Sequence, residues 1–279
     1  MTDTTQSNEL LASTAHWTAA VRAAESVRGD RLFDDPWAAR LAGDEGAAWI
    51  APRPAESVVP IVLRTRYFDD FLERVTAEHR IRQVVIMAAG LDTRAYRLAW
   101  PEGTRFFELD QPVVLAHKEK VLTAAGAQPT CPRAAIEVNL AEPWQDALVA
   151  AGFVAGQPSV WLLEGFLFYI PTELLTRLLG DVADFAVAGS WLGCDVINSD
   201  MLTSPFTRGW VEMQAQAGAP WIGVLDDPAA FLGGRGWNVT LTQAGQPDAS
   251  YGRWTLPIIP TTMPNMPHNW FVTAQKRDS

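Results

Sequence analysis

Residues 84–94 read VVIMAAGLDTR, a short and continuously apolar run followed by a turn that contains Gly90. An apolar run without alternation is typical of a β-strand that is buried on both faces of a sheet. Similar runs recur along the chain with helical segments between them, and this alternation predicts an α/β fold with a mostly parallel sheet and helices on both faces. The further runs lie at 104–109, 134–138, 159–163 and 190–197, and the helical segments at about 111–125, 142–151 and 172–187.

The segments on either side of this alternation have a different pattern. Before it, three helices are expected, at about 7–27, 34–41 and 58–78. After it, residues 198–223 lack a strand pattern. Two extended runs near the C-terminus predict an antiparallel pair at the edge of the sheet, at about 237–242 and 269–274.

The composition limits the classes of partner. The chain has 279 residues, and 22 Lys and Arg against 32 Asp and Glu give a formal net charge of −10. This balance, with no basic run, argues against nucleic acid as a partner, because phosphate binding needs a clustered basic face. Cys131 and Cys194 have no metal-type spacing and are expected to be reduced thiols, and the four histidines form no recognisable catalytic string. With neither a signal-peptide pattern nor an apolar run long enough to span a membrane, we expect a cytoplasmic protein with no membrane partner and no metal.

Polar side chains stand where three of the predicted strands end, and ligands of open α/β sheets bind beyond those ends. Asp110 ends the second strand, 20 residues after Gly90, where a carboxylate can accept both hydrogen bonds of a ribose diol. Asn139 and Leu140 end the third strand, as a polar edge and an apolar face suited to adenine. Glu164 ends the fourth strand among apolar residues, where an ionised carboxylate needs a cation. That cation is either a structural salt-bridge partner or the positive charge of a ligand.

Longer strings carry a resemblance to a known family. They are GLDTRAYRL at 90–98, FELDQP at 107–112 and EGFLFYIP at 164–171, with LFDDP at 32–36 and RTRYF at 64–68 nearer the N-terminus. Together they resemble the leucine carboxyl methyltransferase family, which includes bacterial small-molecule methyltransferases such as polyketide carboxyl methyltransferases. The resemblance implies the Rossmann-like fold of class I methyltransferases, with S-adenosylmethionine as cofactor.

With that fold, we predict a single methyltransferase domain. Its four parts are a helical N-terminal cover (1–80), a cofactor-binding core (81–197), a lid insertion (198–235) and C-terminal strands (236–279). The oligomeric state is left open.

The resemblance also assigns roles to single residues. Arg66 would hold the methionine carboxylate, where the bidentate fork of arginine is favoured. Glu164 would face the amino-acid end of the cofactor, and the ammonium group there would neutralise the buried carboxylate. Ala88 would contact the methionine part through its backbone, and Gly90 belongs to the same cofactor-binding loop. Asp110 would bind the ribose diol.

Asn139 and Leu140 would frame the adenine. The sequence departs from the family at two of these positions, because family members usually carry Gly at 88 and Asp at 139. Ala88 adds a methyl group where the backbone should approach the ligand, while the Asn139 carbonyl can still accept a bond from the adenine amino group. We therefore expect weaker, not absent, cofactor binding.

The acceptor site is predicted from aromatic residues and from the lack of an obvious base. Methyl transfer from a sulfonium needs alignment and exclusion of water, and a carboxylate acceptor, unlike most hydroxyls, needs no general base. We therefore expect a methyl ester of a secondary metabolite such as an aromatic polyketide, with hydroxyl methylation as the alternative. Tyr169 is the candidate catalytic group. The residues expected to wall a flat pocket are Trp17, Phe166, Tyr169, Phe206, Trp210 and Trp221.

Two other classes stay open from the residues alone. A nicotinamide-dependent oxidoreductase would share the alternation and the acidic residue after the second strand, although the glycines that accommodate a pyrophosphate are missing. A non-catalytic binding protein of methyltransferase fold is suggested by the departures at Ala88 and Asn139.

Overall fold

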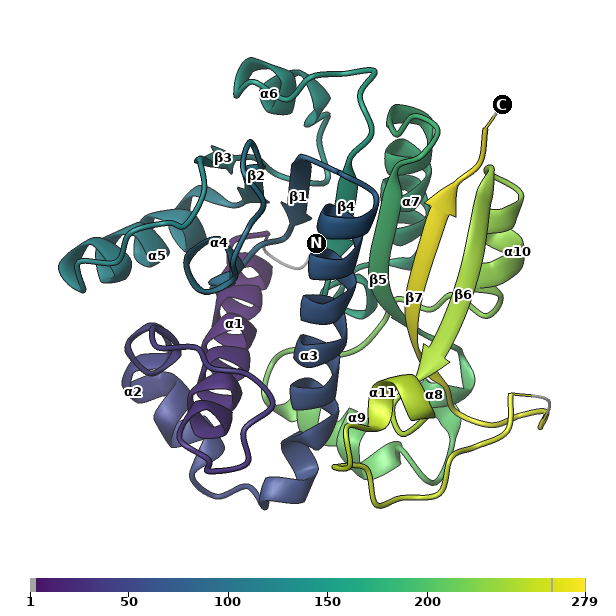
Figure 1. Ribbon diagram of the computed structural model, residues 1–279. Helices are drawn as coiled ribbons and strands as arrows, with labels where there is room; N and C mark the ends of the chain where they lie inside the picture. Colours follow the sequence, from purple (N-terminus) through teal and green to yellow (C-terminus); the bar gives the residue numbers. More distant parts are fainter. Residues whose placement is uncertain (1–3, 262, 279) are drawn as a thin grey trace.

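The computed structural model describes residues 4–261 and 263–278, with side chains described from Thr14 onward. A seven-stranded sheet runs in the order β3-β2-β1-β4-β5-β7-β6, and β7 alone runs antiparallel to the other six strands (Figure 1). This confirms the predicted α/β fold with a mostly parallel sheet and an antiparallel edge pair. The strands are β1 (Gln83–Met87), β2 (Arg105–Asp110), β3 (Arg133–Glu137), β4 (Val160–Leu163), β5 (Trp191–Ile197), β6 (Trp237–Gln243) and β7 (Asn269–Lys276).

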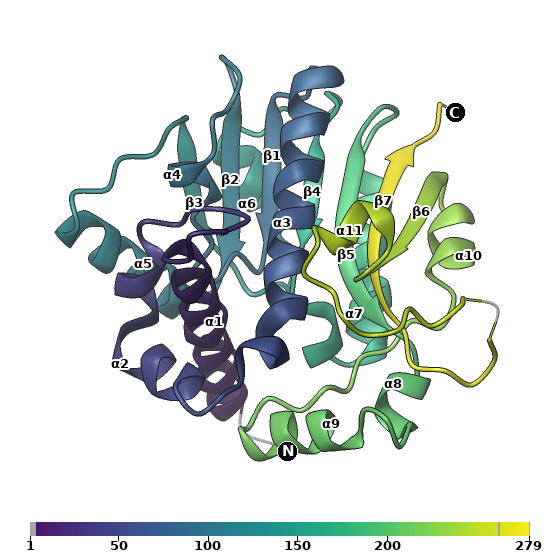
Figure 2. The same ribbon diagram turned by 60° about the horizontal axis from the view of Figure 1, so that its bottom comes forward.

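The sheet carries a core on each face, and β1 contributes to both because successive side chains of a strand point to opposite faces. Val84 packs in a cluster with Phe68 of α3, and Val85 packs in another with Leu178 of α7. Figure 2 shows α3 in front of the sheet and α7 behind it. The helices are α1 (Thr4–Ser26), α2 (Ala38–Ile50), α3 (Ala55–Glu78), α4 (Arg94–Arg97), α5 (Pro112–Ala124), α6 (Gln145–Ala150), α7 (Thr172–Phe185), α8 (Asp200–Thr203), α9 (Arg208–Gln216), α10 (Pro228–Gly233) and α11 (Pro247–Ser250), with a 3₁₀ turn η1 (Leu167–Tyr169).

The expected short helix at 34–41 differs from the structure in both bounds. The α2 helix begins at Ala38, after a turn in which Asp35 Oδ1 accepts a hydrogen bond from Trp37 N at 3.2 Å. Gly43 interrupts the helix with a φ of +56°, and the helix then resumes as far as Ile50. Glycine adopts this left-handed conformation without steric cost, so the chain kinks at Gly43, two residues after the predicted end of the helix.

Residues 198–235 hold α8, α9 and α10 and no strand. At the last of these helices, Asp227 Oδ1 accepts a hydrogen bond from Ala230 N at 2.8 Å and caps the N-terminus of the helix. The α8 and α9 helices lie beneath the sheet at the bottom of Figure 2. Among the described helices, none combines the length and the apolarity needed to cross a membrane.

Candidate functional site

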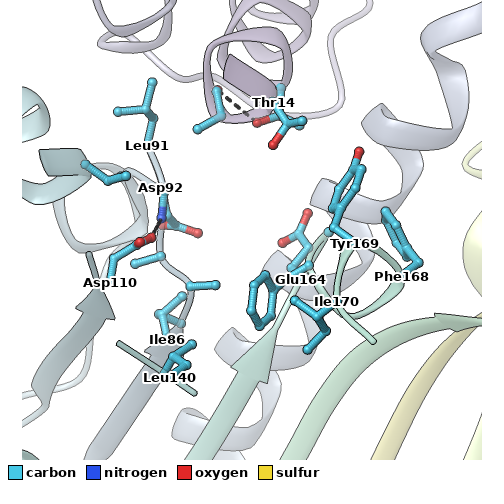
Figure 3. Close-up of a pocket in the computed structure, with 18 of the residues that line it drawn as sticks. Thr14, Ile86, Leu91, Asp92, Asp110, Leu140, Glu164, Phe168, Tyr169 and Ile170 are labelled. Atoms are coloured by element: carbon cyan, nitrogen blue, oxygen red, sulfur yellow. Dashed lines mark hydrogen bonds between the residues drawn. The ribbon is translucent and has the colours of Figure 1, made fainter. Parts of the chain in front are cut away.

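A cavity of about 430 Å³ opens beyond the carboxyl ends of the parallel strands. Figure 3 shows Asp110 and Glu164 on opposite sides of it, with Leu140 below them and Thr14 of α1 above. A volume of this size is typical of small-molecule sites. Ten residues predicted for the site line this cavity, namely Ala88, Gly90, Asp110, Asn139, Leu140, Glu164, Phe166, Tyr169, Trp210 and Trp221.

Asp110 is held rigidly at the end of β2. Its two carboxylate oxygens accept hydrogen bonds from Gly90 N and Gln111 N, each at 2.6 Å. Burial raises the pKa of Asp110, and the two backbone donors oppose that shift without cancelling it. An ionised carboxylate has about four lone-pair sites. Asp110 therefore keeps the capacity to accept further hydrogen bonds from a ligand.

The loop after β1 has an unusual backbone. Ala88 and Gly90 both adopt left-handed conformations, with φ values of +51° and +50°. Glycine does so freely, whereas a residue with a side chain loses about 1–2 kcal/mol in this region. The loop lies under α1, since a Cβ added to Gly90 would be 3.4 Å from the Cβ of Ala15. Ala88 therefore adopts a backbone conformation that suits glycine, and its backbone is strained.

The adenine-facing pair predicted at the end of β3 lies at the same end of the cavity as Asp110. Leu140 is buried, and its side chain is labelled near that of Ile86 in Figure 3. Asn139 is exposed, and its Oδ1 accepts a hydrogen bond from Ala141 N at 3.0 Å, so its carbonyl already shapes the local turn.

Glu164 is paired with cations of the chain itself. Its Oε1 accepts a hydrogen bond from Arg64 Nε at 3.1 Å. Its Oε2 lies 2.7 Å from Arg94 Nη2, in ionic contact without the alignment of a hydrogen bond. The sequence left open whether Glu164 pairs with a cation of the protein or with a ligand. The structure contains the salt bridge, so a ligand that approaches Glu164 meets a carboxylate that is already paired with Arg64 and Arg94.

The prediction for Arg66 is corrected by the structure, because this residue does not line the cavity. Its guanidinium donates to Asp70 Oδ1 at 2.8 Å and to Leu32 O at 2.5 Å, and its side chain is 38% exposed. Arg64, two residues earlier on α3, lies in the cavity wall instead. Since each residue turns a helix by about 100°, two residues rotate the side chain by about 200° to the opposite face.

Arg64 and Asp195, its second ionic partner, are the main functional candidates that the sequence reasoning missed. Arg64 Nη1 donates to Asp195 Oδ2 at 2.9 Å, and Asp195 Oδ1 accepts a hydrogen bond from Gly165 N at 2.6 Å. A Cβ on Gly165 would lie 2.6 Å from Arg64 Nη2, and the φ of Gly165 is +66°, so a side chain there would displace the guanidinium and strain the backbone. The available signal was a single aspartate inside the apolar run at 190–197. Burial raises the pKa of Asp195, although Arg64 opposes the shift.

Two of the aromatic residues expected to wall the acceptor pocket lie elsewhere. Trp17 is buried against Trp49, with the ring centroids 5.1 Å apart and the planes 8° from parallel, so it packs α1 on α2. Phe206 is 80% exposed and does not line the cavity. Both predictions were wrong because apolar character alone does not tell which neighbour a side chain meets.

The remaining aromatics form one end of the cavity. The ring centroids of Phe168 and Trp221 are 4.7 Å apart, and those of Trp210 and Trp221 are 6.2 Å apart. Tyr169 points toward the side of the cavity where Thr14 lies (Figure 3), and its Oη accepts a hydrogen bond from Gln214 Nε2 at 3.2 Å. Burial raises the pKa of Tyr169. This end of the cavity is therefore an apolar aromatic wall with a protonated phenol in it.

The fold and the site together define a class I methyltransferase. The chain superposes on a structure of a methyltransferase from Thermobifida fusca with a TM-score of 0.60, at 16% identity and with 94% of each chain covered. It superposes on a DUF574 family protein from Streptomyces avermitilis with a TM-score of 0.59, at 14% identity, covering 92% of this chain and 96% of that one. At these identities the likeness concerns the fold alone.

Residues 15–183 match the family model described as leucine carboxyl methyltransferase. A relative from Streptomyces coelicolor, named as an S-adenosyl-L-methionine-dependent methyltransferase, is 38% identical over 253 residues, which are 86% of this chain and 88% of the relative. A relative of the same name from Frankia alni is 38% identical over 259 residues, with 86% and 87% covered. The chain belongs to the leucine carboxyl methyltransferase family, and it is a methyltransferase.

Proposed function

We propose that this enzyme transfers a methyl group from S-adenosylmethionine, its cofactor, to a carboxylate oxygen of a small planar acceptor, a secondary metabolite such as an aromatic polyketide. The observation that carries the proposal is one cavity with two chemically different ends. Asp110 forms one end with Asn139 and Leu140, and Phe168, Trp210 and Trp221 form the other, on the side where Glu164 lies.

The charge of the cavity wall fits a cationic cofactor. Four guanidiniums and three carboxylates line the cavity, and three further carboxylates pair with those guanidiniums from behind the wall, which makes six carboxylates against four guanidiniums. S-adenosylmethionine carries a sulfonium and an ammonium against one carboxylate, and its net positive charge complements this excess. The groups are Asp35, Asp69, Asp92, Asp110, Glu164 and Asp195 against Arg22, Arg64, Arg94 and Arg97.

The residues of the wall suggest how the cofactor would be held. Asp110 would accept the ribose hydroxyls, and Asn139 and Leu140 would frame the adenine. Arg64 replaces Arg66 as the proposed partner of the methionine carboxylate, because no described residue hydrogen-bonds to its Nη2. When bound, the cofactor supplies an activated methyl group, so this chain needs to align the acceptor and exclude water.

The aromatic end favours a carboxylate acceptor. Hydroxyl methylation calls for a general base, and burial raises the pKa of Tyr169, which makes its hydroxyl a donor and a poor base at neutral pH. Asp195 is occupied by Arg64 and Gly165. An ionised carboxylate needs no base and can accept the proton of Tyr169 as a hydrogen bond.

Incubation with methyl-labelled cofactor and a panel of aromatic carboxylates and phenols tests this function. We expect labelled products that mild alkali hydrolyses to labelled methanol, as methyl esters do. Label that survives alkali, as in an aryl ether or a methylamine, would contradict carboxyl methylation.

We further propose that the enzyme is cytoplasmic and acts on no nucleic acid. Cys131 and Cys194 are free thiols, as expected in a reducing compartment. The net charge of −10 disfavours a polyanionic partner.

A further inference from the structure

A second cavity, of about 390 Å³, lies beside the first and is walled in part by the same two helices. Arg22 of α1 and Arg64 of α3 face the first cavity, whereas Val21 and Val62 of these helices face the second. The loop between α2 and α3 supplies a further part of the wall through Arg53. A volume of this size is typical of a small-molecule site, and the proposed function leaves it unused.

The wall of the second cavity is aliphatic, in contrast to the aromatic end of the first. The apolar residues among those that line it are valines, alanines and an isoleucine. Val21, Val58 and Val62 are buried in one hydrophobic cluster at this wall. Removal of each methylene group from water against such side chains is favourable. The wall therefore suits a hydrocarbon chain.

Three arginines also line the second cavity, and carboxylates neutralise two of them. Arg253 Nη2 lies 3.2 Å from Glu25 Oε1, and Arg28 Nε lies 3.0 Å from Asp30 Oδ1. The third arginine, Arg53, forms no ion pair with any residue in the part of the chain that the structure describes. Arg53 is therefore the cation of this cavity that lacks an anion.

The contacts of Arg53 fix its position without neutralising its charge. Its guanidinium carbon lies 3.7 Å from the centroid of the Trp49 ring, its Nη1 donates to Trp49 O, and its Nη2 donates to Met213 Sδ at 4.0 Å. Burial lowers the pKa of Arg53, because this half-buried cation loses water and gains no carboxylate in return. Each Nη carries two N–H groups and uses one of them, so one N–H of each is left for a ligand.

We propose that the second cavity binds an aliphatic carboxylate, with its carboxylate on Arg53 and its hydrocarbon chain against Val21, Val58 and Val62. The planar fork of a guanidinium matches the two oxygens of a carboxylate. Glu56, which also lines the cavity, is exposed, so solvent and salt screen its repulsion of the ligand. The inference does not depend on the acceptor of the methyl group, because the two cavities have different walls.

The first test is calorimetric titration of the unaltered protein with octanoate and with octan-1-ol, which keeps the chain and lacks the charge. We expect octanoate to bind at one site and at least about 10-fold more tightly than the alcohol, the value of a charge-assisted contact. Saturation with S-adenosylhomocysteine should leave the octanoate affinity unchanged, because that compound belongs to the first cavity. Absence of octanoate binding at millimolar concentration, equal affinities of acid and alcohol, or competition with S-adenosylhomocysteine would overturn the proposal.

The second test locates the bound octanoate. Arg53→Met removes the charge and keeps an unbranched side chain, so octanoate should bind at least about 10-fold more weakly while the affinity for octan-1-ol is unchanged. Arg31→Met is the matched control and should bind both compounds as the unaltered protein does, since Arg31 is exposed and lines neither cavity.

A third variant keeps the charge and fills the space. Val59 lines the second cavity and is half-buried, so Val59→Trp should weaken octanoate and octan-1-ol alike by about 10-fold or more, with Arg53 still in place. This variant also keeps the proposal testable if Arg53→Met does not fold. Full octanoate affinity in either Arg53→Met or Val59→Trp would refute the assignment.

Discussion

Arg64 and Arg66 provide a matched pair of substitutions, because the two arginines are two residues apart on α3 and meet different surroundings. Arg64 contacts Glu164 and the fully buried Asp195, with its own side chain 10% exposed. Arg66 pairs with Asp70, and both of these side chains are more than one third exposed. Replacement of each arginine by methionine removes the charge and keeps an unbranched chain of similar reach.

The expected losses of stability differ several-fold. Breaking a buried pair leaves an uncompensated charge and costs about 3–5 kcal/mol, whereas an exposed pair contributes about 0–1 kcal/mol. For a chain of this size, Arg64→Met should lower the melting temperature by about 6–20 °C and Arg66→Met by no more than about 4 °C. Calorimetric titration on the folded proteins should also show about 10–100-fold weaker binding of S-adenosylhomocysteine in Arg64→Met only, the value of a charge-assisted contact.

The stability of Arg64→Met should depend on pH in a defined direction. Burial already raises the pKa of Asp195 above its ordinary value, and loss of Arg64 removes the cation that opposes this shift. A carboxyl group whose pKa is higher in the folded than in the unfolded state favours folding as the pH falls through that folded pKa. The stability deficit should therefore be smaller at pH 5 than at pH 8 in urea titrations. Weaker cofactor binding in Arg66→Met than in Arg64→Met would refute the reasoning about the whole site.

Three further substitutions test single features. Ala88→Gly should raise the free energy of unfolding by up to about 1 kcal/mol in thermal unfolding, because glycine relieves the strain at a φ of +51°. The same substitution should tighten the binding of S-adenosylhomocysteine, which calorimetric titration measures. Trp221→Ala should raise the KM for the acceptor about 10-fold or more and leave cofactor affinity unchanged in steady-state assays, because its ring lines the cavity. Phe206→Ala, at a side chain 80% exposed, should change neither quantity, and equal effects of the two substitutions would contradict the assigned aromatic wall. Trp17→Ala should lower the free energy of unfolding by about 3–5 kcal/mol in urea titrations, because its buried ring is stacked on Trp49. A loss below about 1 kcal/mol would show that the stacked pair is not part of the core.

The fold was predictable because its signals are local and repeated. Five largely apolar runs alternate with helical segments, and each corresponds to a strand of the parallel part of the sheet. Asp110 could be placed in the site for the same reason, because it ends one of these strands and ligands bind at those ends.

The missed residues depend on contacts between distant segments. Arg64 and Arg66 are both arginines of the same helix, and only the direction in which α3 packs on the sheet decides which of them faces the cavity. Trp17 was assigned to the cavity, yet α2 covers it. Gln214 gives no sequence signal, because a glutamine on a short polar helix is normally exposed and its burial depends on where α9 docks.

A crystal structure of the protein with bound S-adenosylhomocysteine tests the central claim most directly. We predict that the nucleoside occupies the cavity described, with the ribose hydroxyls within hydrogen-bond distance of Asp110 and the carboxylate of the amino-acid part at Arg64. The sulfur should then face the end formed by Tyr169, Trp210 and Trp221. Density for the cofactor outside this cavity, or with its carboxylate at Arg66, would contradict the account.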